Sequence, residues 1–119
     1  MTNQEAFEKV VARLTDGRGR AMNEHRACMY RAPSGLPCAV GCLIPDEEYR
    51  KDLEGSSIMA LGNLTLPSLA GLDLYMLAAV QAVHDGYQYW IGKTLNESGI
   101  KALQNIAWQY NLTMPEIER

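Results

Sequence analysis

Apolar residues recur with helical spacing at the start of the chain. They lie three and four positions apart, the period of a helix with one buried face: Phe7, Val10, Val11 and Leu14. Thr2 and Glu5 before them have the spacing of a capping box, and Gly17 is a typical helix-ending residue. The pattern predicts a helix over residues 3–16 whose apolar face packs against another element.

Residues 28–44 show alternation instead, around the strongest turn signal in the sequence. The Pro-Ser-Gly triplet at 33–35 fits a tight turn, because proline presets the first corner and glycine accepts a left-handed backbone. The predicted hairpin pairs Ala32 with Leu36, Tyr30 with Cys38, Cys28 with Val40 and Arg26 with Cys42. Gly41 within the second strand indicates a bulge or a close approach of another backbone.

Two further helices are expected on either side of residue 90. One is the longest apolar helical pattern, which runs from Ser68 to Asp85. The other follows a second capping box, formed by Thr94 and Glu97, and ends at Asn111. Together they supply enough apolar surface to cover the hairpin.

The segments between and after these elements give weaker signals. Acidic residues after Pro45 suit the first turn of a short helix that ends by Gly55. Residues 56–71 are rich in leucine and are either core or a partner surface. The tail from Met114 onward is expected to be loose unless a partner holds it.

These elements predict an α+β fold in one domain, residues 1–119. It consists of an N-terminal helix, a β-hairpin that could extend into a small antiparallel sheet, and three to four further helices. A two-stranded sheet is marginal by itself, so helices or a second subunit must cover it. An exposed strand edge would allow a homo-oligomer.

Composition narrows the class of protein. The chain has 119 residues, 47% of them hydrophobic, and a net charge of −3, which is typical of a folded domain. No stretch is long and apolar enough for a membrane span, and no secretory leader is apparent. Three cysteines, an odd number, favour a reducing cytoplasm over a disulfide framework. The basic residues of the first 31 positions form neither a dense stripe nor a motif, which argues against nucleic-acid binding.

The cysteines raise the possibility of a zinc module. The predicted register places Cys28, Cys38 and Cys42 on one face of the hairpin, and His84 could supply a fourth ligand. Their spacing lacks the C-x2-C pair of structural zinc sites, and buried cysteine is the simpler interpretation. We therefore expect no metal and no cofactor, and keep the zinc module as an alternative.

One other stretch resembles a polar site with an aromatic wall. His84 and Asp85 are followed by Tyr87 and Trp90, and such a histidine–carboxylate pair occurs in hydrolases. Neighbouring helical residues diverge by about 100°, and no nucleophile is evident, so polar residues at a helix end explain the pair more simply. A small hydrolase remains a second alternative, which a solvent-inaccessible His84 would argue against.

The segment 28–49 also carries a resemblance. Its pattern is similar to a motif of small hypothetical proteins from tailed phages and prophages: CxYRxPxGxxCAVGCLIPDxxY. His84 and Asp85, with a tryptophan shortly after, resemble a second part of that pattern. Such proteins carry no established activity, so the resemblance implies only a phage accessory protein in the host cytoplasm, with inhibition of a bacterial defence system as a plausible role.

The resulting hypothesis is a non-enzymatic binding protein. Its partner would be a host protein or a small nucleotide-like signalling ligand that it sequesters, and no membrane is involved. The candidate binding residues are Tyr30, Arg31, His84, Asp85, Tyr87 and Trp90.

Overall fold

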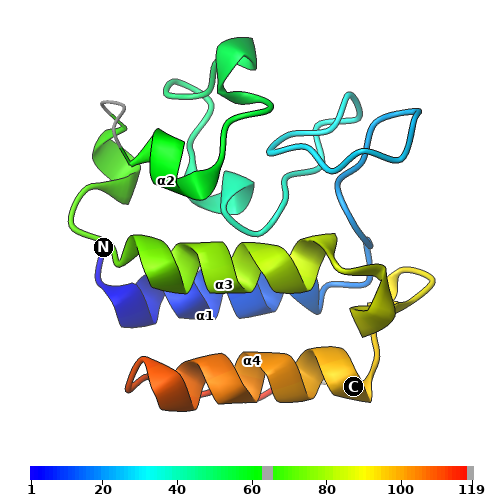
Figure 1. Ribbon diagram of the computed structural model, residues 1–119, viewed down its shortest axis with the longest axis vertical. Helices are drawn as coiled ribbons and strands as arrows, with labels where there is room; N and C mark the ends of the chain where they lie inside the picture. The colour runs from blue at the N-terminus through cyan, green and yellow to red at the C-terminus, as the bar shows by residue number, and fades with distance from the viewer. Residues whose placement is uncertain (63–65, 118–119) are drawn as a thin grey trace.

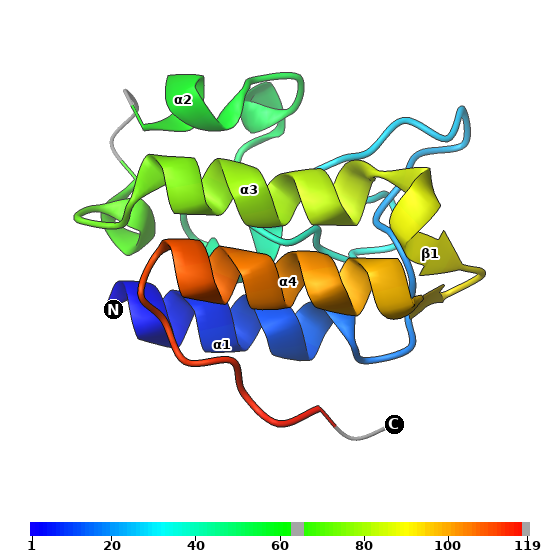
Figure 2. The same ribbon diagram turned by 60° about the horizontal axis from the view of Figure 1, so that its bottom comes forward.

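Three helices form the body of the molecule. The computed structural model describes residues 1–62 and 66–117. Helices α1 (Asn3–Leu14) and α3 (Leu74–Asp85) run in the same direction, and α4 (Glu97–Gln109) runs back beside them (Figures 1 and 2). Each buries one face, and the three faces meet in a shared core that includes Phe7, Leu77 and Leu103, all 0% exposed.

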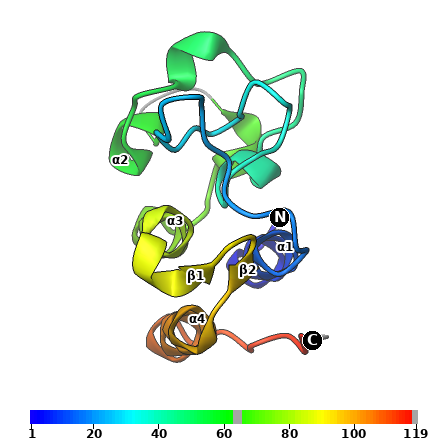
Figure 3. The ribbon, with the colours of Figure 1, turned by 90° about the vertical axis from the view of Figure 1, so that its right-hand side faces the viewer.

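The long connection between α1 and α3 covers one side of these helices. Viewed end-on, it lies to one side of α1 and α3, with α4 on the other (Figure 3). Its regular elements are short: 3-10 helices at Gly41–Leu43, Lys51–Leu53 and Pro67–Leu69, and helix α2 at Ile58–Leu61. Helix α2 packs against α3 (Figure 1).

A small antiparallel sheet joins α3 to α4. After a 3-10 turn at Tyr87–Tyr89, strand β1 (Trp90–Ile91) pairs with β2 (Thr94–Leu95). Trp90 stands opposite Leu95, and both are buried against the helices. The protein is therefore an α+β fold with an N-terminal helix and a two-stranded antiparallel sheet, as predicted, although this sheet lies at residues 90–95.

The expected central hairpin is present only near its turn. The turn is confirmed, with Gly35 at φ +93°, and the N–H of Cys38 donates to the carbonyl of Tyr30 at 3.0 Å. Beyond Cys38 the predicted pairs are wrong: the chain turns and enters the 3-10 helix, while Cys28 bridges to Met22. Gly41 permits this turn, because any side chain at that position would collide with the carbonyl oxygen of Tyr30. The predicted close backbone approach is thus confirmed, but it ends the strand.

The apolar spacing predicted helices α1, α3 and α4 correctly, but some of their predicted ends differ from the structure. Helix α1 has the predicted capping box, with the side chain of Thr2 accepting from the N–H of Glu5. The cap of α4 is Asn96 and not Thr94, because Thr94 belongs to strand β2. Helix α3 begins after Asp73 and not at Ser68, since the Asp73 side chain accepts two N–H groups of its first turn.

The structure also answers two weaker expectations. The helix expected after Pro45 is reduced to turns and the 3-10 helix at Lys51–Leu53. Within residues 56–71, the described leucines and isoleucine are core: Ile58, Leu61, Leu66 and Leu69 are buried. Residues 63–65 lie outside the described part of the chain.

The C-terminal tail packs along α1, contrary to the expectation that it is loose. The main chain of Thr113 exchanges two hydrogen bonds with the side chain of Gln4, at 2.8 and 2.9 Å. Met114 and Ile117 pack against the core. Figure 2 shows this tail passing α1. Among the described helices, none is long and apolar enough to cross a membrane.

Candidate functional site

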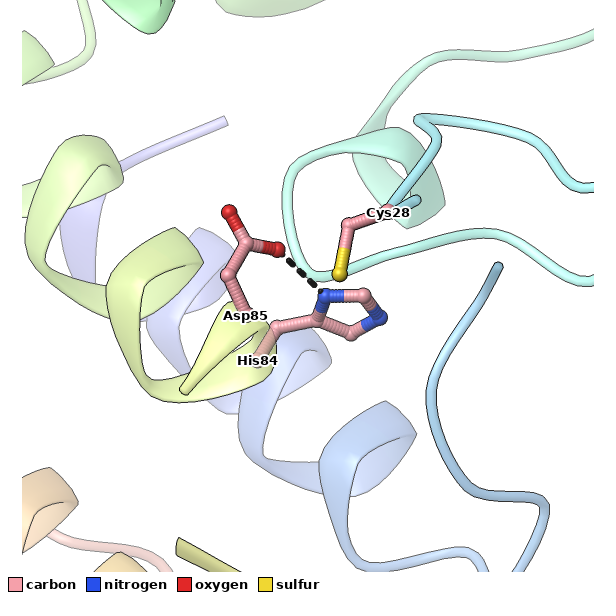
Figure 4. Close-up of side chains that lie close together, drawn as sticks. All are labelled: Cys28, His84 and Asp85. Carbon is pink, nitrogen blue, oxygen red and sulfur yellow. Dashed lines mark hydrogen bonds and ion pairs between the residues drawn. The ribbon is translucent and has the colours of Figure 1, made fainter. Parts of the chain in front are cut away.

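Three side chains with reactive groups meet at the C-terminal end of α3. Cys28 comes from the connection, and His84 and Asp85 are the last residues of α3. One polar atom from each lies within 4.8 Å of the other two. Figure 4 shows the Cys28 sulfur pointing toward the imidazole ring, beside the Asp85 carboxylate. His84 and Asp85 contact each other directly, at 2.8 Å, although neighbouring helical residues were expected to diverge.

The hydrogen bonds of His84 fix the position of its proton. The side chain is 0% exposed. Its Nε2 atom accepts the backbone N–H of Ala21 at 2.9 Å, so Nε2 must carry a lone pair. The ring proton therefore sits on Nδ1 and is donated to Oδ1 of Asp85 at 2.8 Å. Both ring nitrogens are engaged, and neither is available to take a proton from a substrate.

Trp90 holds the last turn of α3 from the other side. Its indole N–H donates to the carbonyl oxygens of Val83 and His84, at 3.1 and 3.0 Å. These are helix-terminal carbonyls that lack a partner within the helix. The indole ring also meets the His84 ring edge-on, with centroids 6.3 Å apart. Trp90 is 8% exposed and acts as a structural support rather than as a surface residue.

Asp85 is held in its charged form. Burial opposes ionisation, but hydrogen bonds from His84, Gln81 and Cys28 outweigh it and lower the pKa of the carboxyl. The amide N–H of Gln81 reaches Oδ1 at 2.8 Å. Figure 4 shows the other carboxylate oxygen pointing away from the imidazole. The side chain is 45% exposed, so this charge faces solvent.

Cys28 has the opposite character to an activated nucleophile. Burial, the neighbouring Asp85 charge and a hydrogen bond to Asp85 raise the pKa of its thiol to about 11. A reactive cysteine needs a positive surrounding that lowers this value. The three residues thus resemble a catalytic triad by type, yet both ring nitrogens of the histidine are occupied, and burial and the Asp85 charge raise the pKa of the thiol.

The same geometry bears on metal binding. The described residues bring His84 together with Cys28 and Asp85, and not with the set of Cys28, Cys38 and Cys42 considered above. Cys38 instead lies 3.1 Å from Oε1 of Gln81. A metal at Nδ1 of His84 would move the ring proton to Nε2, where it would oppose the Ala21 N–H. The donor chemistry at this site therefore fits a hydrogen-bonded cluster better than a zinc centre.

A cleft of about 480 Å³ opens beside this cluster. One wall is the face of α3 that carries Ala78, Ala82 and Asp85, and the other is the segment 54–59. Its lining includes Cys28, Met29, Tyr30, Glu54, Ser56, Ser57, Ile58, Met59 and Gln81. Its size lies within the range of ligand sites, and its apolar side chains and few polar groups are typical of them.

The Glu54 carboxylate links Tyr30 and Arg31 to Tyr49 beside this cleft. Its carboxylate accepts the N–H groups of Tyr30 and Arg31 at 2.8 and 3.0 Å, and the hydroxyl of Tyr49 at 2.6 Å. The Tyr30 hydroxyl donates to the carbonyl oxygen of Ser56. These bonds fix the wall opposite α3.

The six residues predicted from the sequence do not form one surface. Tyr30 and Asp85 line the cleft, whereas His84 and Trp90 are buried and are not part of its lining. The remaining two lie elsewhere. Arg31 pairs with Asp46 at 2.8 Å and stacks on Tyr49, and Tyr87 is 78% exposed on the turn after α3.

Sequence reasoning missed the contribution of residues 54–59 and of Gln81. Gln81 precedes Asp85 by one helical turn, a spacing that could have indicated their contact. No local pattern marks Glu54, whose partners lie up to 24 residues away. Comparisons with family models, with curated proteins and with solved structures found no match to this chain.

Proposed function

We propose that this is a non-enzymatic binding protein that recognises its partner through the cleft beside α3. The observation that carries the proposal is the cleft itself, about 480 Å³ in volume, whose acid–base groups are already hydrogen-bonded to one another. Acid–base catalysis needs an available base, and covalent catalysis needs an activated nucleophile. Both ring nitrogens of His84 are hydrogen-bonded, and the Cys28 thiol has a raised pKa, so this site supplies neither group. A partly apolar cleft instead suits recognition of a partner.

The side chains of the cleft favour a protein partner over a nucleotide-like ligand. Glu54 and Asp85 both line it, and their negative charges repel phosphate. Met59, 43% exposed, and Met29 also line it, and flexible methionine side chains adapt to varied partner surfaces. Ala78 and Ala82 have small side chains, so a segment of another chain can lie close to helix α3.

The proposed setting follows from the sequence motif of residues 28–49. Its resemblance to tailed-phage and prophage proteins supports an accessory protein that acts in the host cytoplasm. We propose that it inhibits a bacterial defence system by binding one of its proteins. Sequestration of a small signalling ligand and self-association through the same face are the competing outcomes.

The test is a phage plating assay in strains that each carry one bacterial defence system. The native protein is expected to restore plating in one strain. Ala82→Arg places a long side chain in the cleft and should abolish the effect. Gln104→Arg introduces the same side chain at an exposed position of α4 and should not.

The outcomes of this assay separate the alternatives. Restored plating that only Ala82→Arg abolishes supports inhibition through the cleft. Equal activity of both variants would show that the cleft is not the binding surface. No restored plating in any strain would argue against the inhibitor role. Mass spectrometry of the native complex from the restored strain then distinguishes a protein partner from a small ligand or a second copy.

A further inference from the structure

We infer that the partner presents an arginine side chain to Asp85, together with an apolar side chain further along α3. This inference rests on the proposed function and names the chemistry of the partner. It comes from the distribution of charge and apolar surface in the cleft.

The charged side chains that line the cleft are negative. Among its described lining residues two are acidic, Glu54 and Asp85, and none is a lysine or arginine. Arg20 approaches Asp85, but its guanidinium contacts the backbone carbonyl oxygen at 3.4 Å. The cleft therefore presents net negative charge, which is complementary to a cationic group.

The hydrogen-bond partners of Asp85 leave its negative charge in place. The neighbouring ring of His84 is neutral, because its Nε2 accepts from Ala21 and its one proton is on Nδ1. Gln81 is uncharged, and its amide donates to the same oxygen as His84 does, Oδ1. No neighbour in this cluster neutralises the carboxylate. Its second oxygen points away from His84 (Figure 4), where an incoming donor can reach it.

Arginine fits this cleft better than lysine does. Its guanidinium is more weakly hydrated than the ammonium of lysine, and it can donate several N–H groups while its flat face lies on apolar atoms. The cleft is lined by both kinds of surface: the Asp85 carboxylate, and the side chains of Met29 and Met59. A lysine would lose more hydration in the same place.

The distance between Ala78 and Asp85 along α3 sets the spacing of the recognised segment. Ala78 and Asp85 are seven residues apart on α3, about 10 Å along the helix axis. Three residues of an extended chain span about the same distance. Ile58 lines the cleft together with Ala78, and both are apolar. The matching segment carries an apolar residue three positions from an arginine.

The test uses four short peptides and NMR titration of the isotopically labelled protein. Two peptides are acetyl-Leu-Ala-Ala-Arg-amide and acetyl-Arg-Ala-Ala-Leu-amide, which cover both chain directions. In the other two, citrulline replaces arginine and removes the charge while keeping the shape. We expect one arginine peptide to bind about fivefold more tightly than its citrulline partner, the size typical of a partly exposed ion pair.

Two variants locate the effect. Asp85→Asn keeps an oxygen acceptor for His84 and should make the arginine and citrulline peptides bind equally. Asp52→Asn removes an acid that is 74% exposed and lies outside the cleft lining, and it should leave the preference intact. Raising the salt concentration should also reduce the preference, because salt screens the charge.

Equal binding of arginine and citrulline peptides to the native protein would overturn the inference, as would binding of neither. Both of these binding outcomes are measured on the native protein, so they can be interpreted even if Asp85→Asn fails to fold. Suppose that the native protein does not prefer arginine over citrulline peptides, while Ala82→Arg abolishes plating activity. This result would contradict the arginine inference and leave the proposed function standing. Retained plating activity in Ala82→Arg would instead overturn the proposed function.

Discussion

The backbone N–H of Ala21 donates a hydrogen bond of 2.9 Å to Nε2 of His84, a residue 63 positions later in the chain. This bond joins the loop after α1 to the last turn of α3. It also sets the tautomer of the imidazole, and through Nδ1 it orients the carboxylate of Asp85. One backbone amide thus determines the state of the whole cluster.

His84→Phe should therefore destabilise the protein. Phenylalanine keeps a flat ring at this position, although a larger one, and it leaves the buried N–H of Ala21 without an acceptor and removes the donor to Asp85. We expect a loss of about 3 kcal/mol in the free energy of unfolding, measured by urea denaturation. The matched control is His25→Phe, at a site 81% exposed, which should change stability by less than about 0.5 kcal/mol. Similar losses in both variants would contradict a structural role for His84.

The charge on Asp85 should appear as a pH dependence of stability. Hydrogen bonds from His84 and Gln81 lower the pKa of this carboxyl in the folded protein despite its partial burial, below the ordinary value of 3.8. The folded state thus takes up the proton less readily than the unfolded state. Its stabilisation is present above about pH 4 and disappears as the pH falls through the lower folded value.

The measurement compares urea unfolding of the native protein and Asp85→Asn between pH 7 and pH 2.5. At pH 7 the native protein should be the more stable of the two, and the difference should shrink below about pH 4. Asp52→Asn, at an exposed site, provides the control. A difference between native protein and Asp85→Asn that stays constant over the whole range would show that ionised Asp85 contributes nothing.

The fold was predictable where one local signal decides the structure. The apolar period and the capping box of residues 2–5 predicted α1, and the Pro-Ser-Gly triplet at 33–35 predicted its turn. The strand after that turn was not predictable. A run that is apolar on both faces has no period to distinguish a strand from a buried 3-10 helix. The contact of Gly41 with the Tyr30 carbonyl, which decides it, depends on the tertiary fold.

The candidate site was predictable only in part, for a similar reason. The pair His84 and Asp85 stood out by residue type, and Asp85 does line the cleft. The proton arrangement could not be foreseen, since it depends on an amide of Ala21 far away in the sequence. The wall formed by residues 54–59 has no motif, and the Glu54 carboxylate in it finds partners 23 and 24 residues away in the sequence.

Cys28 should react slowly with alkylating reagents in the folded protein. Burial and the charge of Asp85 raise the pKa of its thiol to about 11, so about one molecule in a thousand carries the reactive thiolate at pH 8. Asp85→Asn removes the negative neighbour and should speed alkylation of Cys28 by iodoacetamide, followed by peptide mass spectrometry.

Cys42 provides an internal control in the same experiment. Burial raises its pKa to about 11 as well, while its charged neighbours are Arg13, Lys9, Asp16 and Arg18. Its alkylation rate should therefore be the same in native protein and in Asp85→Asn. Faster alkylation of both cysteines would indicate general loosening of the fold rather than a charge effect on Cys28.

Gly41→Ala should disrupt the segment that carries the cysteines. A methyl group at this position would collide with the carbonyl oxygen of Tyr30 and crowd the sulfur of Cys38. Since Tyr30 and Gly41 are both buried, the chain has little room to move apart. We expect a loss of more than about 2 kcal/mol in the free energy of unfolding, and shifted NMR signals over residues 28–43.

Gly17→Ala is the control that separates collision from backbone strain. Gly17 has φ +81°, with no atom within 4 Å of an added Cβ, so alanine there meets only the cost of a left-handed conformation. That cost is about 1 kcal/mol. If urea denaturation gave both variants the same stability, the approach of the Tyr30 carbonyl to Gly41 would not be what ends the hairpin. A larger loss for Gly41→Ala, with NMR changes confined to residues 28–43, would establish that the chain ends its hairpin through this contact.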